Sequence, residues 1–394
     1  MKRSARQFLI ALTFASLSMP FCAPGQTWTQ CITAPSKLWY RVACSSNANM
    51  LIAAANPGSI YTSTNFGATW ISNNVPSKNW CAVICSADGK RLAAAASSSG
   101  AQIWASADSG ATWSLTSAPT GSLQNYTSMA ASSDGTKLAA TGAYAPTRYI
   151  YTSADSGSSW APTSAPNYPW TSIASSSDGS CLVSAAYNWY TIATSSDSGA
   201  SWIIHTVPTN YWYAVSSSAD GSVLAAASLI SGTLFISTNA GSAWVSNNAP
   251  KVSYYCLASS ADGHTLFAGH AAGLYSTSDT GRTWLSNSVP SYLWASIACT
   301  PDAKRGVAAV SPAYNTSTLW ILSTLPPSLM ASASRSNVTL SWPGASTNFQ
   351  FQQALAIQAP DWKDVTNSVV ITDGQNTVAI AKTNTQAFFR LRGL

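Results

Sequence analysis

The sequence predicts an all-β protein, a seven-bladed β-propeller followed by a small β-sandwich-like domain. Three observations predict it. An eight-residue motif recurs along the chain, a tryptophan closes each copy at intervals near 40 residues, and the incomplete units at the two ends complement each other. A repeat of about 40 residues is typical of propeller blades, each made of four antiparallel strands.

The motif is clearest at residues 106–113, which read Ser-Ala-Asp-Ser-Gly-Ala-Thr-Trp. Asn65 and Asn239 replace the aspartate in two of the other copies, and a shortened copy ends at Trp28. The closing tryptophans are 42, 43, 47, 42, 42 and 40 residues apart. Further full copies occupy 63–70, 153–160, 195–202, 237–244 and 277–284.

Between two tryptophans each unit follows one order. A segment ending in Ala-Pro or Val-Pro precedes an aromatic residue and a small, apolar run such as 170–174. An Asp-Gly pair, such as Asp134-Gly135, then precedes a second apolar run and a β-prone run. Asp-Gly between apolar runs predicts a type I′ hairpin turn, with positive φ at both central residues. The motif predicts another turn, in which Asp or Asn caps backbone N–H groups, Gly takes a positive φ and Trp packs beneath the loop. Each unit therefore supplies four short strands.

The two ends of the repeat predict how the ring closes. The chain enters with only the last strand of a unit, at 27–32, and leaves after the third strand of another, at 319–322. An open solenoid of the same units would leave two exposed sheet edges. We therefore predict a closed propeller over 26–325, fastened by pairing of the terminal strands. Strand-like runs in 326–394 predict a sandwich-like domain of fibronectin type III-like character, namely 338–342, 349–355, 369–372, 377–380 and 387–391.

Residues 1–25 have the features of a secretory signal peptide. Lys2, Arg3 and Arg6 precede an apolar stretch, 8–19, that is too short to span a bilayer. We expect cleavage after Gly25 and a secreted product, extracellular, periplasmic or on the cell surface, without a transmembrane segment. The formal net charge of +6 loses these three positive charges on cleavage. The balance is too small and scattered to favour nucleic acid as a partner.

Export would permit disulfides, but an odd number of cysteines leaves at least one unpaired or intermolecular. No closely spaced Cys/His cluster of the zinc type and no phosphate-binding glycine-rich loop occurs. We therefore expect no metal and no cofactor. The cysteines that follow the predicted leader are Cys31, Cys44, Cys81, Cys85, Cys181, Cys256 and Cys299.

The recurring motif resembles the Asp-box, or bacterial neuraminidase repeat, of the sialidase-like superfamily. Such repeats are found in sialidases, xyloglucan-degrading propellers, sortilin-type receptors and photosystem II assembly factor-like propellers. The resemblance covers residues 25 to about 324 and implies the propeller fold. It does not imply an activity, since one fold carries many functions.

The sequence lacks the catalytic residues that an enzyme of this superfamily is expected to have. Sialidases are expected to use a tyrosine nucleophile with a glutamate partner, and the chain contains no Glu. Xyloglucan-type enzymes are expected to enclose a cleft between two propellers. A glycosidase of the usual type needs two carboxylates facing each other. We predict a protein that is not an enzyme, because ten of the 13 aspartates belong to the repeats: 88, 108, 134, 155, 178, 197, 220, 262, 279 and 302.

Seven aromatic residues share one phase of the repeat and open the innermost strand of each blade. A closed ring places them in a circle near one mouth of the central channel. They either pack between blades or form an aromatic-lined binding face. The second interpretation predicts that truncating Trp170 or Trp212 abolishes binding without lowering stability. The seven are Trp39, Trp80, Tyr126, Trp170, Trp212, Tyr254 and Trp294.

Arg41 stands two residues beyond its aromatic, where the other units have small residues. It binds an anion or polar ligand, or it pairs with a carbonyl group. The loops between the second and third strands are expected to flank the same mouth. They hold Tyr144, Arg148, Tyr187, Asn188, Trp189, Tyr190, His270 and Tyr314.

The candidate ligand-binding set comprises the seven aromatics together with Arg41, Arg148 and Trp189. We predict a secreted, non-catalytic propeller that binds a glycan or a protein through this face. The alternatives are a divergent sialidase- or glycoside hydrolase-like enzyme and an assembly scaffold resembling the photosystem II assembly factor-like propellers.

Overall fold

The structure, a computed structural model, describes residues 27–97, 100–120, 125–142, 149–187, 191–205, 207, 210–310 and 317–323, and the strands between Met330 and Gly393. Within these residues every regular element is a β-strand. The described chain has no helix that is long and apolar enough to cross a membrane. It divides into two compact units, one of which spans Trp28–Leu322. The predicted signal peptide lies outside the described residues, so export stays a prediction.

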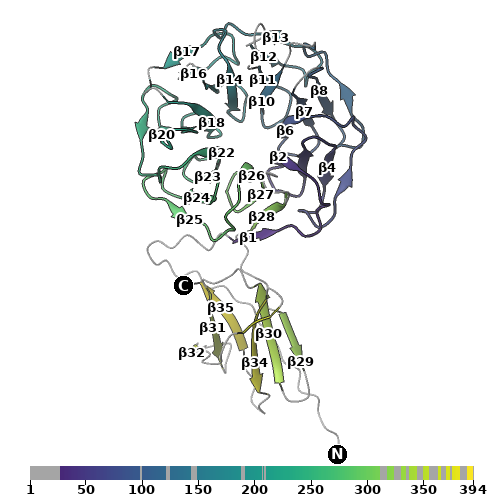
Figure 1. Ribbon diagram of the computed structural model, residues 1–394, viewed down its shortest axis with the longest axis vertical. Coiled ribbons are helices and arrows are strands. Elements are labelled where there is room, and N and C mark those ends of the chain that lie inside the picture. Colours follow the sequence, from purple (N-terminus) through teal and green to yellow (C-terminus); the bar gives the residue numbers. More distant parts are fainter. Residues whose placement is uncertain are drawn as a thin grey trace, which may run out of the picture. The chain divides into compact units, whose positions relative to one another are not determined.

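The unit Trp28–Leu322 is a seven-bladed propeller (Figure 1). Six blades are four-stranded antiparallel sheets whose strand order follows the chain. They contain β2 (Trp39–Cys44), β3 (Leu51–Ala55), β4 (Ile60–Ser63) and β5 (Ile71–Ser72); β6 (Trp80–Cys85), β7 (Leu92–Ala96), β8 (Ile103–Ser106) and β9 (Ser114–Leu115); β10 (Tyr126–Ala131), β11 (Leu138–Gly142), β12 (Ile150–Ser153) and β13 (Ala161–Pro162); β14 (Trp170–Ser175), β15 (Leu182–Ala186), β16 (Thr191–Ser195) and β17 (Ile203–His205); β18 (Trp212–Ser217), β19 (Leu224–Ser228), β20 (Leu234–Ser237) and β21 (Val245–Ser246); and β22 (Tyr254–Ser259), β23 (Leu266–His270), β24 (Gly273–Thr277) and β25 (Leu285–Ser286).

The seventh blade joins the two ends of the repeat. It contains β26 (Trp294–Cys299), β27 (Arg305–Val310) and β28 (Leu319–Ser323), and its outermost strand is β1 (Thr27–Gln30). The sheet order is β1-β28-β27-β26, and the N–H of Cys31 donates to the carbonyl of Leu319 at 2.8 Å. The predicted closure by the terminal strands is confirmed. We call the junction between β26 and β2, where the last blade meets the first, the seam.

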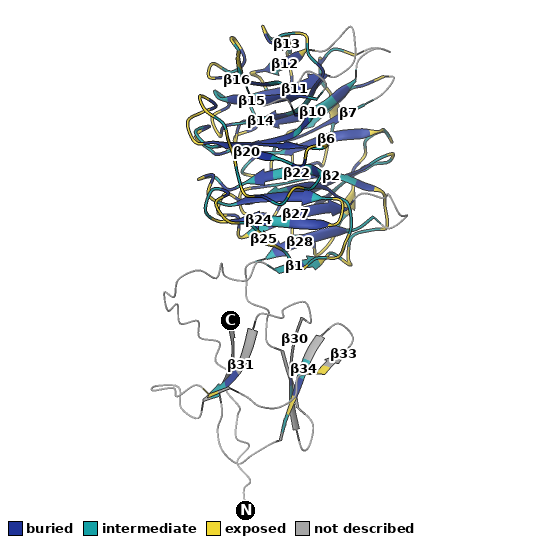
Figure 2. Cartoon of the chain, turned by 60° about the vertical axis from the view of Figure 1, so that its left-hand side comes forward, coloured by how far each residue is buried: buried dark blue, intermediate teal, exposed yellow. Residues whose placement is uncertain are grey.

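The strands of a blade differ in burial according to their distance from the channel (Figure 2). All five residues of β3, β7 and β19 are buried, because each second strand is covered by a neighbouring blade on both faces. This explains the continuous Leu/Ala/Val runs, which a sheet with one solvated face would not need. In the first six blades the outermost strands are two or three residues long and mostly exposed, as in β5 and β25. Such short edges limit pairing with other chains.

Serine hydroxyls join the innermost strands of neighbouring blades. The N–H of Val42 donates to Oγ of Ser296 at 3.2 Å, and the N–H of Val215 donates to Oγ of Ser172 at 3.1 Å. An innermost strand is a sheet edge, so these serines satisfy backbone groups that the sheet itself leaves unpaired. This accounts for small polar residues two positions after the ring aromatics.

A series of backbone hydrogen bonds also runs from blade to blade at the end of the channel where the innermost strands finish. Six bonds connect the seven blades in order: Ser46 N–H to Ala87 O (3.0 Å), Ala87 to Ser133 (2.6 Å), Ser133 to Ser177 (2.7 Å), Ser177 to Ala219 (2.7 Å), Ala219 to Ala261 (2.8 Å) and Ala261 to Pro301 (2.7 Å). The seventh bond, across the seam, cannot form because Pro301 has no N–H.

The recurring motif forms the turn that the sequence predicts. Oδ1 of Asp108 accepts the N–H of Thr112 at 2.8 Å and the hydroxyl of Ser106 at 2.8 Å. Gly110 has a φ of 89°, and its carbonyl accepts the indole N–H of Trp113 at 3.2 Å. Asn65 caps Thr69 in the same way at 2.9 Å, so the turn requires the oxygen and not the charge.

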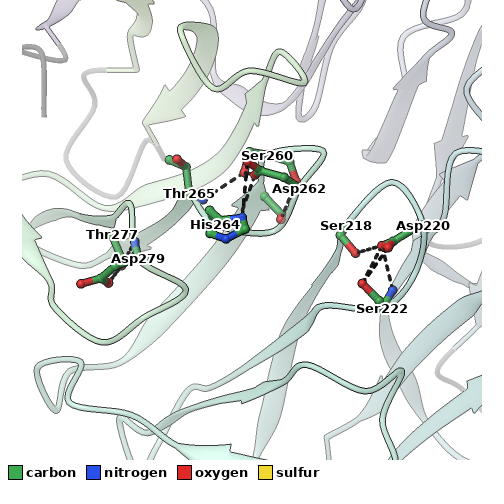
Figure 3. Close-up of polar contacts among 10 residues, drawn as sticks. Ser218, Asp220, Ser222, Ser260, Asp262, His264, Thr265, Thr277 and Asp279 are labelled. Carbon is green, nitrogen blue, oxygen red and sulfur yellow. Dashed lines mark hydrogen bonds and ion pairs between the residues drawn. The ribbon is translucent and has the colours of Figure 1, made fainter.

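The Asp-Gly turns differ from the predicted type I′ geometry in one respect. Gly221 has a positive φ of 75°, but Asp220 does not have one. The N–H of Gly221 donates to the carbonyl of Ser218 at 3.1 Å, while Oδ1 of Asp220 accepts Ser218 Oγ at 2.6 Å and Ser222 N–H at 3.0 Å (Figure 3). The side-chain bonds hold Asp in a right-handed turn and leave the left-handed position to Gly alone.

These turns predict a loss of stability in acid. Hydrogen bonds from Thr112 and Ser106 lower the pKa of Asp108 to about 2, and bonds from Ser218 and Ser222 do the same for Asp220. An aspartate in the unfolded chain titrates near 3.9. Because the folded pKa is the lower one, this stabilisation is complete above about pH 4 and is lost as the pH falls through about 2. We expect the midpoint of urea unfolding to decrease over that interval.

The variant Asp108→Asn is the matched control for the acid prediction. Its amide oxygen caps as Asn65 and Asn239 already do, but it does not titrate. We expect a smaller decrease of the urea midpoint between pH 4 and pH 2 in this variant. A wild-type midpoint that is unchanged over this interval would show that the turns do not couple protonation to folding.

The second unit holds two antiparallel sheets beyond Ser323, with orders β29-β30-β34-β33 and β32-β31-β35. Leu340 pairs with Val378, and both are buried. The fibronectin type III-like character stays a prediction. The strands are β29 (Met330–Ala333), β30 (Asn337–Pro343), β31 (Phe349–Ala354), β32 (Lys363–Asp364), β33 (Val370–Thr372), β34 (Gln375–Ala381) and β35 (Phe388–Gly393).

Candidate functional site

The seven ring aromatics do not form a binding face. Each is at most 1% exposed, because its side chain points between blades. Trp170 donates its indole N–H to the carbonyl of Pro166 at 3.1 Å, which explains why a proline-ended segment precedes the aromatic. The packing interpretation is therefore correct, and the binding-face interpretation is wrong for all seven: Trp39, Trp80, Tyr126, Trp170, Trp212, Tyr254 and Trp294.

A β-bulge follows each ring aromatic and decides which residue faces the channel. In every innermost strand the pairing register shifts between the aromatic and the second residue after it, as between Trp212 and Ala214. A bulge inserts one unpaired residue and re-aims its side chain. The inserted residues all line the central cavity: Tyr40, Cys81, Thr127, Thr171, Tyr213, Tyr255 and Ala295.

The central cavity has a volume of about 530 Å³ and lies at the end of the channel where the innermost strands begin. All seven innermost strands, which lie around the centre of the ring in Figure 1, contribute residues to its wall. Asn56 and Ser97 follow β3 and β7, so loops after the second strands flank this mouth as the sequence predicts. Among the described lining residues Arg41 is the one charged side chain.

Arg41 binds backbone carbonyls from three strands. Its Nε donates to Cys81 O on β6 at 2.8 Å, and Nη1 donates to Tyr40 O on β2 at 3.1 Å and to Ala295 O on β26 at 3.2 Å. Its guanidinium also lies 3.9 Å from the ring centre of Tyr40. Of the two roles predicted for Arg41, pairing with carbonyls is the one that the structure shows. The side chain ties the first blade to the blades on both sides, across the seam included.

Five tyrosines gather beside the cavity, and we call them the tyrosine patch: Tyr40, Tyr187, Tyr211, Tyr213 and Tyr255. All are partly exposed. The ring centres of Tyr187 and Tyr211 lie 5.0 Å apart, and those of Tyr213 and Tyr255 lie 6.1 Å apart. Burial, then the neighbouring phenol of Tyr40, raises the pKa of Tyr213, so its hydroxyl is neutral and can donate or accept a hydrogen bond.

The tyrosine patch shares no residue with the candidate ligand-binding set, and it includes one of the loop residues that the sequence predicts at the mouth, Tyr187. His270 ends β23 and stacks on Tyr275 at 4.9 Å, so it packs within its own blade. A sequence signal for the patch exists, because Tyr40, Tyr213 and Tyr255 each follow directly after a ring aromatic. The other predicted mouth residues lie outside the described residues: Tyr144, Arg148, Asn188, Trp189, Tyr190 and Tyr314.

The carboxylates of the propeller lie away from this mouth. No aspartate is among the described residues that line the cavity. The repeat aspartates accept hydrogen bonds within their own turns, as Asp155 does from Ser159 and Asp178 does from Ser176. Among the described residues no three His, Cys or Asp side chains are placed to hold a metal ion. The described lining of the mouth thus consists of aromatic and polar groups and the guanidinium of Arg41.

No family model and no curated protein matches the sequence of this chain. Its fold matches YCF48 from Cyanidioschyzon merolae with a TM-score of 0.58 and 14% identity, over 74% of this chain and 98% of that one. A structure of YCF48 bound to D1 peptide matches with a TM-score of 0.56 and 15% identity, over 78% and 99%. The GH74 xyloglucanase from Xanthomonas campestris matches with 0.57 and 13%, over 81% of this chain and 60% of the enzyme. Likenesses at these identities show the propeller fold alone.

Proposed function

We propose that this propeller is a non-catalytic binding protein that holds an extended segment of a protein partner at the tyrosine patch. The observation that carries the proposal is the patch itself, five partly exposed phenol rings from four blades beside a cavity of about 530 Å³. Tyrosine supplies a large, rigid contact surface with a polar end at a low cost in conformational entropy.

The chemistry of the mouth favours an uncharged segment of the partner whose side chains can pack against aromatic rings. The described lining offers amide, hydroxyl and phenol groups, and three N–H groups of its single cation, Arg41, already bind carbonyls. A cavity of this size accommodates a few side chains or sugar units, not a folded domain. That a YCF48 structure is bound to D1 peptide supports the idea that a propeller of this shape can hold a peptide.

A glycan is the second candidate, and the exposed rings favour it. Partly exposed aromatic rings such as Tyr187 and Tyr255 can contact the apolar faces of sugars, and a xyloglucanase shares the fold. The absence of carboxylates from the described cavity lining supports binding without hydrolysis. Peptide and glycan arrays probed with the full chain would separate the two candidates.

The double variant Tyr213→Ala/Tyr255→Ala tests the patch. Truncating central aromatic residues of an interface costs about 2 kcal/mol or more, so we expect at least a ten-fold rise in Kd for the best array ligand. Isothermal titration of the full chain would measure it. The thermal midpoint should change little compared with a variant of a ring aromatic, because both rings are partly exposed.

Tyr275→Ala is the matched control for the binding test. Tyr275 is a partly buried tyrosine on β24, in the same blade as Tyr255 but outside the patch and the cavity lining. It should bind the ligand as the wild type does. Equal losses in the control and the double variant would remove the tyrosine patch as the site.

We also propose that the repeat belongs to the Asp-box class. The support is its geometry: in full copies the first Ser or Thr donates to the Asp or Asn, and the Gly N–H donates back to that hydroxyl, as in Ser195, Asp197 and Gly199. The same network forms with Thr277, Asp279 and Gly281. Figure 3 shows Thr277 beside Asp279. This network is a turn that sets blade spacing, so the assignment supports no catalytic role for the aspartate.

A further inference from the structure

At one end of the channel, the seam lacks the backbone hydrogen bond that joins the other neighbouring blades. Each of the other six junctions carries a backbone hydrogen bond between equivalent turn residues, such as Ala87 N–H to Ser133 O at 2.6 Å. At the seam the donor position is Pro301, which has no N–H to give to the first blade. Closure at this end therefore needs another connection, or it depends on the pairing of β1 with β28 elsewhere in the blade.

Two cysteines face the channel at this same junction. Cys44 ends β2 and Cys299 ends β26, each five residues after its ring aromatic. Both line a cavity of about 210 Å³ at the mouth opposite the tyrosine patch, together with Cys85. The equivalent residues of the other four blades are Ala131, Ser175, Ser217 and Ser259.

The two strands are in contact across the seam. Arg41 binds the carbonyl of Ala295 at 3.2 Å, and the N–H of Val42 binds Ser296 Oγ at 3.2 Å. Cys44 and Cys299 occupy the same position of the two strands and line the same cavity. Equivalent positions of neighbouring blades lie close at this mouth, since Sγ of Cys299 donates to the carbonyl of Ser259, the equivalent residue of the preceding blade, at 3.4 Å. Burial raises the pKa of the Cys299 thiol, and the thiol of Cys44 raises it further. Both thiols are reduced in this structure.

We propose that Cys44 and Cys299 form a disulfide that locks the ring at its seam when a disulfide oxidant, such as oxidised glutathione, is present. Thiol–disulfide exchange breaks the S–S bond of the oxidant, removes two electrons and two protons from the two thiols, and forms one Sγ–Sγ bond. The oxidant leaves as two molecules of its thiol. The bond replaces the link that Pro301 prevents, and it encloses most of the propeller in one covalent loop.

Cys85 is the competing partner of Cys44, and a bond between these two would stabilise the ring less. The thiols of Cys44 and Cys85 also interact, since Cys85 raises the pKa of Cys44 after burial has done so. The junction between their blades, however, is continuous in sequence and already carries the bond from Ser46 to Ala87 at 3.0 Å. A cross-link there encloses a short loop, whereas a long loop restricts the unfolded chain more.

Peptide mapping of the oxidised full chain tests the proposal. The reduced protein would be incubated with oxidised glutathione at about pH 8.5, because raised thiol pKa values slow exchange. It would then be alkylated, digested and examined by mass spectrometry without reduction. We expect a linked pair of peptides containing Cys44 and Cys299, and a higher urea midpoint than in the reduced protein.

Two serine variants make the outcome decisive. Cys299→Ser places the residue that other blades carry at this position, so it should fold, and it should lose both the linked pair and the gain in urea midpoint. Cys85→Ser should keep both. A wild-type linkage of Cys44 to Cys85, or alkylation of Cys44 and Cys299 after oxidation of the folded protein, would overturn the proposal.

Discussion

Trp170→Ala is expected to lower the free energy of unfolding by about 3–5 kcal/mol, the usual cost of removing a buried tryptophan. Trp170 is 0% exposed and packs among residues of two blades, Ala139 and Ile150 from one and Leu182 from its own. The variant also leaves the Pro166 carbonyl without its indole donor. Urea unfolding followed by circular dichroism would measure the loss, and Trp212→Ala should behave alike because Trp212 is equally buried.

The same pair of variants separates packing from binding. If the ring aromatics formed a ligand surface, truncation would abolish binding and leave stability unchanged. The burial of these side chains predicts the opposite result. The variants should be less stable, and the fraction of the protein that remains folded should still bind the ligand. Thr171→Ala, a change in the inserted residue next to Trp170, is the local control. A Trp170→Ala protein as stable as this control would refute the packing role.

Much of the fold could be predicted because its signals are local. Turns need particular residues, so Asp108 with Gly110 marks a turn wherever the pair recurs. The spacing of these turns sets the number of blades, and the complementary end fragments set the closure. The burial of the second strands is also visible in runs such as 92–96, which lack any polar alternation.

The candidate site could not be predicted in the same way, because a one-residue bulge is not written in the pattern of apolar residues. Regular alternation places Trp39 and Arg41 on one face and Tyr40 on the other. The bulge between Trp39 and Arg41 breaks that alternation and turns Tyr40 toward the channel, while Trp39 stays between blades. Since a slip of one residue exchanges the two faces of a strand, the predicted aromatic face was displaced by one position along the chain.

The role of Arg41 also depended on contacts that are distant in sequence. Two of its three acceptors belong to Cys81 and Ala295, 40 and 254 residues away. A single exceptional residue in a repeat indicates a special position, but it does not tell whether that position serves a ligand or the ring. The ring closure supplies the answer, because only a closed propeller brings β26 beside β2.

Arg41→Ala is expected to lower the free energy of unfolding by about 1.5–3 kcal/mol, the range for losing hydrogen bonds to a charged group. The variant removes the donors of three carbonyls, from Tyr40, Cys81 and Ala295, at the junctions on both sides of the first blade. Water that enters the central cavity hydrogen-bonds to the exposed carbonyls and offsets part of the lost free energy. The effect is therefore smaller than the sum of three separate hydrogen bonds. Urea unfolding at neutral pH would measure it.

Arg91→Ala is the matched control, since Arg91 also crosses a blade junction. Its Nη1 donates to the carbonyl of Asp134 at 3.1 Å, but this bond is single and exposed to solvent. Substitutions at such surface sites usually change stability by less than about 0.5 kcal/mol. Because both variants remove one arginine and one positive charge, their difference isolates the bonding of Arg41 inside the channel. Equal losses would mean that Arg41 contributes no more than a surface arginine, and that the seam is held by its strands alone.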